Sequence, residues 1–330
     1  MKNKNEISYI NEFISSLYEN YNYLEIEKID ILQRDRIDYS VLNSRKVFKL
    51  IDKSGNKYIL KYINNSRNTV DLNLIFNNLK LDNFSNTIYP IKNNFGGYKT
   101  NFYGGFYLLF PEYNLEKTLQ SDIYKIIDIY SNLYISINKY NVNSSVTDYI
   151  NNIKYFLQFS KKTKKYFSLI LKKLDIEEKY FYDNLELYID FLSQNKLNLI
   201  YSSFWEGNIY KNNDNILFID LDSIKFGDKF YDMCSILLFA YKFYNKDNTK
   251  RYEIYLYVID LFFKKLSDNN ISNFKFIKGL FLYFTFFTYI DIDISRNEWN
   301  IILKDIYINY KFTKDFLVFF EKLDISYNNE

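Results

Sequence analysis

Apolar residues change their spacing along this chain near residue 112. Before that point they form short runs typical of strands, at Val47–Ile51, Tyr58–Ile63 and Gly104–Tyr113, whereas after it they recur with the spacing of helices. Strands gathered in one part of a chain and helices in another are typical of the α+β class. The sequence therefore predicts a small β-sheet lobe, residues 1–112, and a larger helical lobe, residues 113–330.

Two departures from this pattern help to place the elements. Residues 7–21 and 69–81 have helical spacing inside the first lobe, and Thr69 is the expected N-cap of the second of these helices. Residues 198–224 interrupt the helical lobe with two short apolar strands joined by the turn Lys211–Asn215. The other expected helices are 123–140, 146–159, 165–174, 176–194, 232–244, 250–266, 272–288 and 299–323.

The chain contains no histidine and a single cysteine, Cys234. These counts exclude Ser-His-Asp and Cys-His catalysis, zinc bound by histidine or by several thiolates, and a disulfide within the chain. Chemistry must therefore use carboxylates, lysine, tyrosine or a metal–nucleotide complex that arrives as substrate. The lone cysteine suits a reducing compartment and the N-terminus has no leader-like apolar core, so we expect a cytoplasmic protein.

Charges of opposite sign alternate along the chain, and the net charge is +3. We therefore expect no nucleic-acid partner. We also expect no membrane partner, because the most apolar stretch, Gly279–Ile290, is too short to span a bilayer. The 35 tyrosines accompany abundant Phe, Ile, Asn and Lys, as an AT-rich coding sequence favours; tyrosine cross-linking in an assembly is the alternative explanation.

Asn208 and Asp220 stand at the two ends of the predicted hairpin. Because Mg²⁺ prefers oxygen ligands and keeps several waters, one aspartate and one asparagine suffice beside the phosphates of a nucleotide. Lys61 lies in the middle of the strand Tyr58–Ile63 between apolar neighbours. A lysine there either extends from an edge strand into solvent or contacts a phosphate group.

Three stretches follow one another with a characteristic spacing: YSSFWEGN (Tyr201–Asn208), FIDLD (Phe218–Asp222) and YDMC (Tyr231–Cys234). They resemble the signature of the aminoglycoside phosphotransferase and choline kinase superfamily, a branch of the protein-kinase-like fold. That signature reads His-Gly-Asp, then Asn, then Ile-Asp, and finally Tyr-Asp at the start of a helix. A leading helix, a strand with YILK, and the segments YLLFPEY and FGDKFYDMCSIL resemble the bacterial spore-coat protein S family within that superfamily. The resemblance implies a bilobal fold with Mg²⁺ and ATP as cofactors.

This resemblance assigns roles to individual residues. Asn208 and Asp220 fall on the metal-binding positions, and Lys61 falls on the lysine that binds the ATP phosphates. Asp232 falls on the aspartate that braces the catalytic loop by accepting backbone N–H groups, which is a structural role. Asp71, early in the helix at 69–81, is either the acidic partner of Lys61 or a first-turn carboxylate that complements the helix dipole.

The catalytic loop departs from the family pattern, because Tyr201, Ser202 and Ser203 replace the His, Gly and Asp. Ser203 stands at the position of the catalytic base, and a serine hydroxyl is no base near neutral pH without an activating partner. Asp222, two residues past Asp220 on the same expected strand face, and Glu206 within the loop are the carboxylates that could substitute for the missing base. Each is explained more simply as a supporting or surface carboxylate.

Two functions follow as hypotheses. In the first, the chain is a kinase-like protein of the spore-coat type, with lost or weak phosphotransferase activity and with or without Mg²⁺–ATP binding; its partners are spore-coat proteins, and it is deposited in the coat. In the second, it is an active ATP-dependent kinase whose acceptor is a hydroxyl group of an aminoglycoside, sugar or amino alcohol. Trp205 is expected to pack beneath the loop or to line the acceptor site. Asp291 and Asp293 would attract a cationic acceptor or form a solvated helix end.

Overall fold

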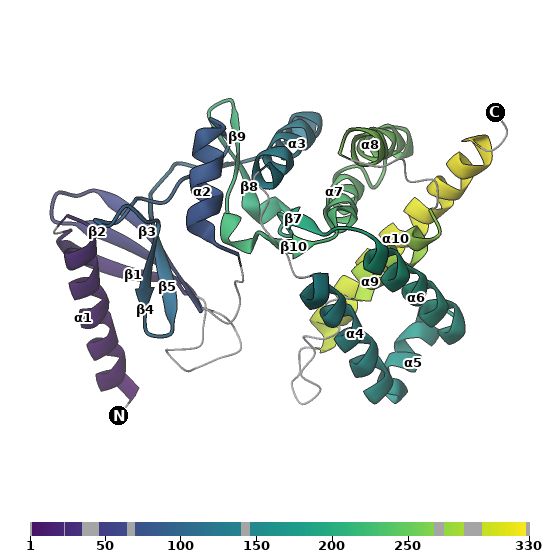
Figure 1. The fold of residues 1–330 in the computed structure, drawn as a ribbon, viewed down its shortest axis with the longest axis horizontal. Coiled ribbons are helices and arrows are strands. Elements are labelled where there is room, and N and C mark those ends of the chain that lie inside the picture. Colours follow the sequence, from purple (N-terminus) through teal and green to yellow (C-terminus); the bar gives the residue numbers. More distant parts are fainter. Residues whose placement is uncertain are drawn as a thin grey trace. The chain divides into compact units, whose positions relative to one another are not determined.

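The computed structural model describes residues 2–22, 24–34, 46–64, 70–139, 146–266, 274–286 and 299–327 (Figure 1). The chain forms two compact units. Unit 1 comprises Met1–Thr118 and Gly207–Lys225, and unit 2 comprises Leu119–Glu206 and Phe226–Glu330. The sequence placed the boundary at residue 112 and the whole hairpin region in the helical lobe, whereas the structure groups residues 207–225 with the first 118 residues.

The described part of unit 1 contains a five-stranded antiparallel sheet and two α-helices. Their bounds are α1 Lys2–Asn20, β1 Ile26–Arg34, β2 Lys46–Asp52, β3 Lys57–Asn64, α2 Leu72–Leu81, β4 Lys99–Phe102 and β5 Gly105–Pro111. The strand order is β1-β2-β3-β5-β4. Lys61 of β3 pairs with Val47 of β2 on one side and with Leu108 of β5 on the other. Lys61 therefore lies on a central strand and not on an edge strand.

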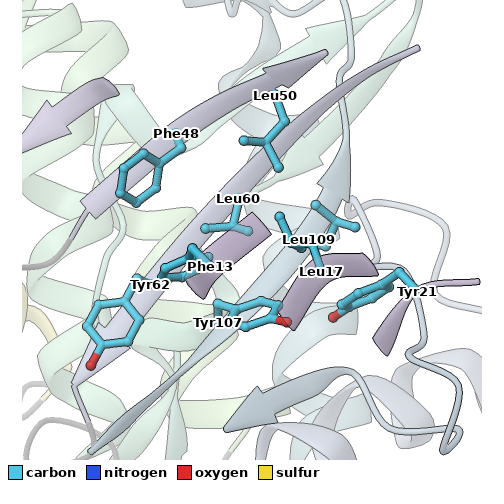
Figure 2. Packing of buried hydrophobic residues seen from close by; sticks show 9 residues of the cluster. All are labelled: Phe13, Leu17, Tyr21, Phe48, Leu50, Leu60, Tyr62, Tyr107 and Leu109. Atoms are coloured by element: carbon cyan, nitrogen blue, oxygen red, sulfur yellow. The ribbon is translucent and has the colours of Figure 1, made fainter. Parts of the chain in front are cut away.

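Helix α1 packs on one face of this sheet (Figure 2). The buried cluster joins Phe13, Leu17 and Tyr21 of the α1 segment to Phe48, Leu50, Leu60, Tyr62, Tyr107 and Leu109 of the strands. Full burial of a side chain of this size contributes about 1.5–3 kcal/mol. Successive residues of a strand point to opposite faces. Since Leu60 and Tyr62 face α1, the side chain of Lys61 points to the other face of the sheet.

Helix α2 begins at Leu72 and has Asp71 as its N-cap. The Asp71 carboxylate accepts the N–H of Asn73 at 3.0 Å, so it satisfies one of the N–H groups that have no partner within the helix. Thr69, the N-cap expected from the sequence, lies outside the described residues. The helix itself, LNLIFNNLKL, contains neither aspartate nor glutamate.

Strands β8 (Ile209–Asn212) and β9 (Asn215–Phe218) form the predicted hairpin, and β6 (Glu116–Lys117) pairs with β8. Two residues that follow α2 connect this hairpin to the first part of unit 1. The Asn86 side chain donates to the carbonyl of Ile216 at 2.8 Å, and its backbone carbonyl accepts the N–H of Phe218 at 2.9 Å. The Thr87 hydroxyl donates to the carbonyl of Phe218 at 2.7 Å. These bonds hold the end of β9 within unit 1.

Unit 2 is mainly helical. Its elements are α3 Ile123–Asn138, α4 Val146–Lys162, α5 Lys164–Lys173, α6 Glu178–Gln194, β7 Asn198–Ile200, β10 Lys225–Gly227, α7 Lys229–Phe243, α8 Asn248–Asp260, α9 Phe276–Phe286 and α10 Trp299–Tyr327, with a π-helical turn, Leu261–Lys265, after α8. A Cβ at Gly279 of α9 would collide with the backbone carbonyl of Asn184, so this glycine allows α9 to lie against α6. Phe281 of α9 stacks on Phe316 of α10, with ring centroids 4.3 Å apart.

Helix α9 contains most of the most apolar stretch of the sequence, Gly279–Ile290. It is buried at nearly every position, including Ile277, Leu280 and Phe286. Within the described ranges, none of the helices has both the length and the apolarity needed to cross a bilayer.

Aromatic side chains fill the cores of both units. Fully buried tyrosines include Tyr62, Tyr98, Tyr107, Tyr130, Tyr188, Tyr201 and Tyr255. Other tyrosines, such as Tyr103 and Tyr155, are more than half exposed. Packing thus accounts for part of the high tyrosine content.

Candidate functional site

Asn208 and Asp220 flank the β8–β9 hairpin, as the sequence predicted. Asn208 directly precedes β8, and Asp220 follows the end of β9 by two residues. The N–H of Ile219 donates to the carbonyl of Asn208 at 2.9 Å, which extends the hairpin ladder to its base. Both residues are thereby placed on hydrogen-bonded backbone at the same end of a rigid element.

The chain turns sharply at Asp220, whose φ of 66° lies in the left-handed region. A single 3-10 turn, Leu221–Ser223, follows, and both the hydroxyl and the N–H of Ser223 donate to the carbonyl of Asp220, at 2.7 and 3.0 Å. The sequence predicted that Asp222 continues the strand on the same face as Asp220. That prediction is wrong: β9 has already ended, and Asp222 sits within the turn.

Lys61 reaches the two carboxylates that this turn presents. Its ammonium forms ion pairs with both Asp220 and Asp222. All three side chains are largely buried, with exposed fractions of 10% for Lys61, 18% for Asp220 and 4% for Asp222. Two negative charges against one positive charge leave this cluster with a net negative charge.

The donor set at the hairpin suits a hard divalent cation. Asn208 is buried and offers an amide oxygen, and Asp220 offers a carboxylate. The ammonium of Lys61 beside both carboxylates shows that a positive charge is already accommodated there. Two protein oxygens would leave most of the octahedral positions of Mg²⁺ to phosphate and water, as this ion prefers. Among the described residues, no group of three or more acidic or cysteine side chains is placed to hold a metal ion.

Unit 2 contains the loop that bears Ser203. The buried carboxylate of Asp232, in α7, accepts the N–H of Tyr201 at 2.8 Å and the N–H of Ser202 at 2.9 Å. It also accepts the hydroxyl of Tyr130 at 2.7 Å. We predicted a carboxylate that accepts backbone N–H groups at this position; the partnership with Tyr130 has no local signal in the sequence. Ser202 adopts the left-handed conformation, with φ 56°.

Burial perturbs the titration of the groups around this loop. Burial and then the nearby Asp232 carboxylate raise the pKa of Tyr130 well above its ordinary value, so its hydroxyl remains a donor. Asp228, the N-cap of α7, accepts the N–H of Phe230 and the hydroxyl of Tyr188. Burial of Asp228 outweighs these hydrogen bonds and raises the pKa of its carboxyl group to about 6.

The structure also shows where the other predicted site residues, Ser203, Glu206 and Asp71, lie. Ser203 is half-buried and belongs to unit 2, whereas Lys61, Asn208 and Asp220 belong to unit 1. Glu206 is exposed, in keeping with a surface carboxylate. Asp71 caps α2, and no ion pair between it and Lys61 is found in the described part of the chain.

One of our two expectations for Trp205, that it packs beneath the loop, is wrong, because this side chain is 58% exposed. Its neighbour Phe204 fills that place, with its ring 5.8 Å from Tyr130 and 5.4 Å from Phe239. Asp291 and Asp293 lie outside the described residues.

Comparisons with known proteins place this geometry in a fold. No protein-family model matches the chain, and a search of curated proteins found no match either. Among solved structures, the chain is similar to a spectinomycin phosphotransferase, APH(9)-Ia, in complex with ADP and spectinomycin; the TM-score is 0.57 at 12% identity, over 94% of this chain and 98% of that chain.

Two further structures are similar. One is the amicoumacin kinase hAmiN in complex with AMP-PNP, Ca²⁺ and Ami, with a TM-score of 0.56 at 13% identity over 91% of this chain and 93% of that one. The other is an aminoglycoside phosphotransferase from Alicyclobacillus acidocaldarius subsp. acidocaldarius DSM 446, with a TM-score of 0.52 at 9% identity over 89% and 93%. The chain therefore has the α+β fold of these kinases, with a β-sheet unit and a larger helical unit, which confirms the predicted fold class.

Proposed function

We propose that this chain is a kinase-like protein that holds a nucleotide and Mg²⁺ through Lys61, Asn208 and Asp220, and whose phosphoryl transfer is weak or lost. The observation that carries the proposal is the contact between Lys61 and Asp220 within unit 1. A lysine that binds phosphate oxygens and an aspartate that binds the metal on those phosphates have to lie side by side. The similar kinases crystallised with ADP and AMP-PNP support a nucleotide as the ligand.

Weak or lost transfer rests on Ser203. A positioned base contributes about 10²–10⁴-fold to the rate of such reactions. Ser203 stands at the position of that base, and the chain has no histidine that could activate its hydroxyl. The metal and the phosphate-binding lysine would still lower the barrier, so a slow residual transfer fits the same site.

Thermal unfolding with and without Mg²⁺–ATP tests nucleotide binding. A ligand at about 100 times its Kd stabilises the folded state by about 2.7 kcal/mol, which for 330 residues raises Tm by about 4 °C. We expect this shift to require Mg²⁺ and to vanish in Asp220→Asn, whose asparagine tolerates the left-handed backbone. Asp214→Asn, at the exposed turn of the same hairpin, should keep the shift. No shift in the wild type at millimolar nucleotide would refute the proposal.

The family resemblance extends the proposal to a location. The strand with YILK and the segments YLLFPEY (Tyr107–Tyr113) and Phe226–Leu237 resemble the spore-coat protein S family, and we propose that the chain is made in the cytoplasm and deposited in the spore coat with coat proteins as partners. Antibody detection in coat extracts of spores from the source organism would support this location. Detection only in the cytosol of vegetative cells would contradict it.

An active small-molecule kinase is the second candidate. The contact of Lys61 with Asp220 favours it as much as it favours nucleotide binding alone. Spectinomycin phosphotransferase and amicoumacin kinase share the fold, so aminoglycosides, sugars and amino alcohols are the acceptors to try with radiolabelled ATP. Turnover that Asp220→Asn abolishes would establish this function, and absence of transfer across the panel would refute it.

A further inference from the structure

Lys61 contacts two carboxylates, and only one of them is used by the proposed metal site. Asp220 is the proposed metal ligand, whereas Asp222 has no role in that site. Yet Asp222 is the more buried of the two, at 4% exposure against 18%. A carboxylate that is buried to this extent is costly unless a charge partner compensates it, and Lys61 supplies such a partner.

Protein kinases hold the phosphate-binding lysine with a glutamate from the helix beside the sheet. In unit 1 the helix that follows β3 is α2, and its sequence contains no aspartate or glutamate. Its N-cap, Asp71, is exposed and uses its carboxylate to accept the N–H of Asn73. Helix α2 therefore gives Lys61 no carboxylate of the usual kind.

We propose that Asp222 is the positioning residue for Lys61 and takes the place of that helix carboxylate. This inference rests on the proposed function, in which Lys61 binds nucleotide phosphates. The left-handed turn at Asp220 and the 3-10 turn after it bring Asp222 to the same ammonium from 161 residues away along the chain. The lysine is thus held on the hairpin side of the site.

A second partner for Lys61 has an electrostatic consequence for the metal. With Asp220 as its sole carboxylate partner, the ammonium would compete with Mg²⁺ for that group. Asp222 gives the ammonium another carboxylate, so Asp220 remains able to bind the metal. Loss of the Asp222 charge should therefore weaken nucleotide binding and also raise the Mg²⁺ concentration that binding requires.

The test is a binding titration of the full-length protein with Mg²⁺–AMP-PNP and a second titration with Mg²⁺ at fixed AMP-PNP. We expect Asp222→Asn to raise the Kd about tenfold, or about 1.4 kcal/mol, and to raise the Mg²⁺ midpoint. Asp222→Glu should recover part of the affinity because it restores the charge. Asp71→Asn, the matched control, removes the α2 cap carboxylate but keeps a good N-cap and should bind like the wild type. Adding Asp222→Asn to Lys61→Met should cause no further loss.

Three results would overturn the inference: wild-type binding by Asp222→Asn, an equal loss in Asp71→Asn, or a loss that is just as large in the Lys61→Met background. A wild type that binds no nucleotide would refute the proposed function instead. In that case the interaction between Lys61 and Asp222 is tested without nucleotide, by urea unfolding of Lys61→Met, Asp222→Asn and the double variant in a double-mutant cycle. The same cycle at the exposed pair Lys53–Glu25 is the control. A midpoint shift of the Lys61–Asp222 double variant that departs further from the sum of its single shifts than in the control supports the positioning role. Additive shifts overturn it.

Discussion

The Lys61 cluster of unit 1 and the Ser203 loop of unit 2 differ in which of their groups are held in place. In unit 1 the charged side chains themselves are in contact, since Lys61 pairs with Asp220 and Asp222. In unit 2 the backbone of the loop is held by Asp232, and Ser203 stands where the family resemblance expects the base. Asp232 accepts main-chain N–H groups of this loop, and almost every residue supplies such a group. The shape of a loop can therefore outlast the chemistry of its side chains.

The largest effect should come from placing a carboxylate at position 203. If the loop in unit 2 has lost only its reactive group, Ser203→Asp should raise phosphoryl transfer to a responsive acceptor by about 10²–10⁴-fold. Ser203→Asn is the matched control, because it has the same shape without a basic carboxylate. Radiolabelled ATP measures both variants. An equal rate for the two would show that the loop of unit 2 lacks more than the base.

The next effect concerns the support of the loop. Asp232→Asn replaces a carboxylate that accepts two N–H groups and a tyrosine hydroxyl with an amide that cannot accept all three. Buried groups left without partners should lower the free energy of unfolding by about 3 kcal/mol. Tyr130→Phe, which removes one donor, should cost about 1 kcal/mol. Urea unfolding measures both; equal costs would mean that the backbone bonds contribute little.

A smaller effect is a pH dependence of the free energy of unfolding, which arises in unit 2 from Asp228 and does not involve the charged cluster of unit 1. Burial raises the pKa of Asp228 from its usual 3.8 to about 6 in the folded state. A raised carboxyl pKa gives a stabilising contribution that is fully present below pH 3.8 and is lost as the pH rises through about 6. Between pH 4 and 7, the wild type should therefore lose about 1–3 kcal/mol relative to Asp228→Asn, which keeps a good N-cap. Parallel stability curves for the two proteins would contradict this assignment.

The smallest effect should come from Ser202. This residue has a φ of 56°, a conformation that glycine adopts without cost, and the resembling family has glycine at this position. Ser202→Gly should raise the free energy of unfolding by about 0.5–1 kcal/mol, because the relieved strain exceeds the added freedom of the unfolded chain. Thermal unfolding measures the gain. A destabilised variant would mean that contacts of the Ser202 side chain outweigh the strain.

The sequence predicted most elements because their apolar residues keep one period over many positions. Strand β1 was missed, since register shifts between Ile26 and Lys28 and between Ile31 and Gln33 break the alternation that marks a strand. Strand β4, KTNF, is only four residues long and mostly polar, so it gives little signal. Strand β6 has two residues.

The site divides in the same way. Residues at the two ends of a hairpin can be predicted to lie together, and this holds for Asn208 and Asp220. Lys61 and Asp220 are far apart in the sequence, so only the family resemblance suggested their contact. The ion pair of Asp222 with Lys61 depends on the left-handed turn at Asp220, and the presence of an aspartate does not predict that conformation. The Asp-x-Asp spacing, together with a helix α2 free of acidic residues, was the available signal.

The division of unit 1 into two stretches of chain has a consequence for biosynthesis. The ribosome completes β3 and Lys61 early, then makes residues 119–206 of unit 2, and only afterwards delivers residues 207–225. Until then, β6, Asn86 and Thr87 lack the strands to which they hydrogen-bond, and Lys61 lacks the carboxylates of Asp220 and Asp222. A nascent chain or a proteolytic fragment that ends before residue 207 contains Lys61 but lacks the proposed metal ligands Asn208 and Asp220. Mg²⁺-dependent nucleotide binding would therefore distinguish chains that have passed this point from shorter ones.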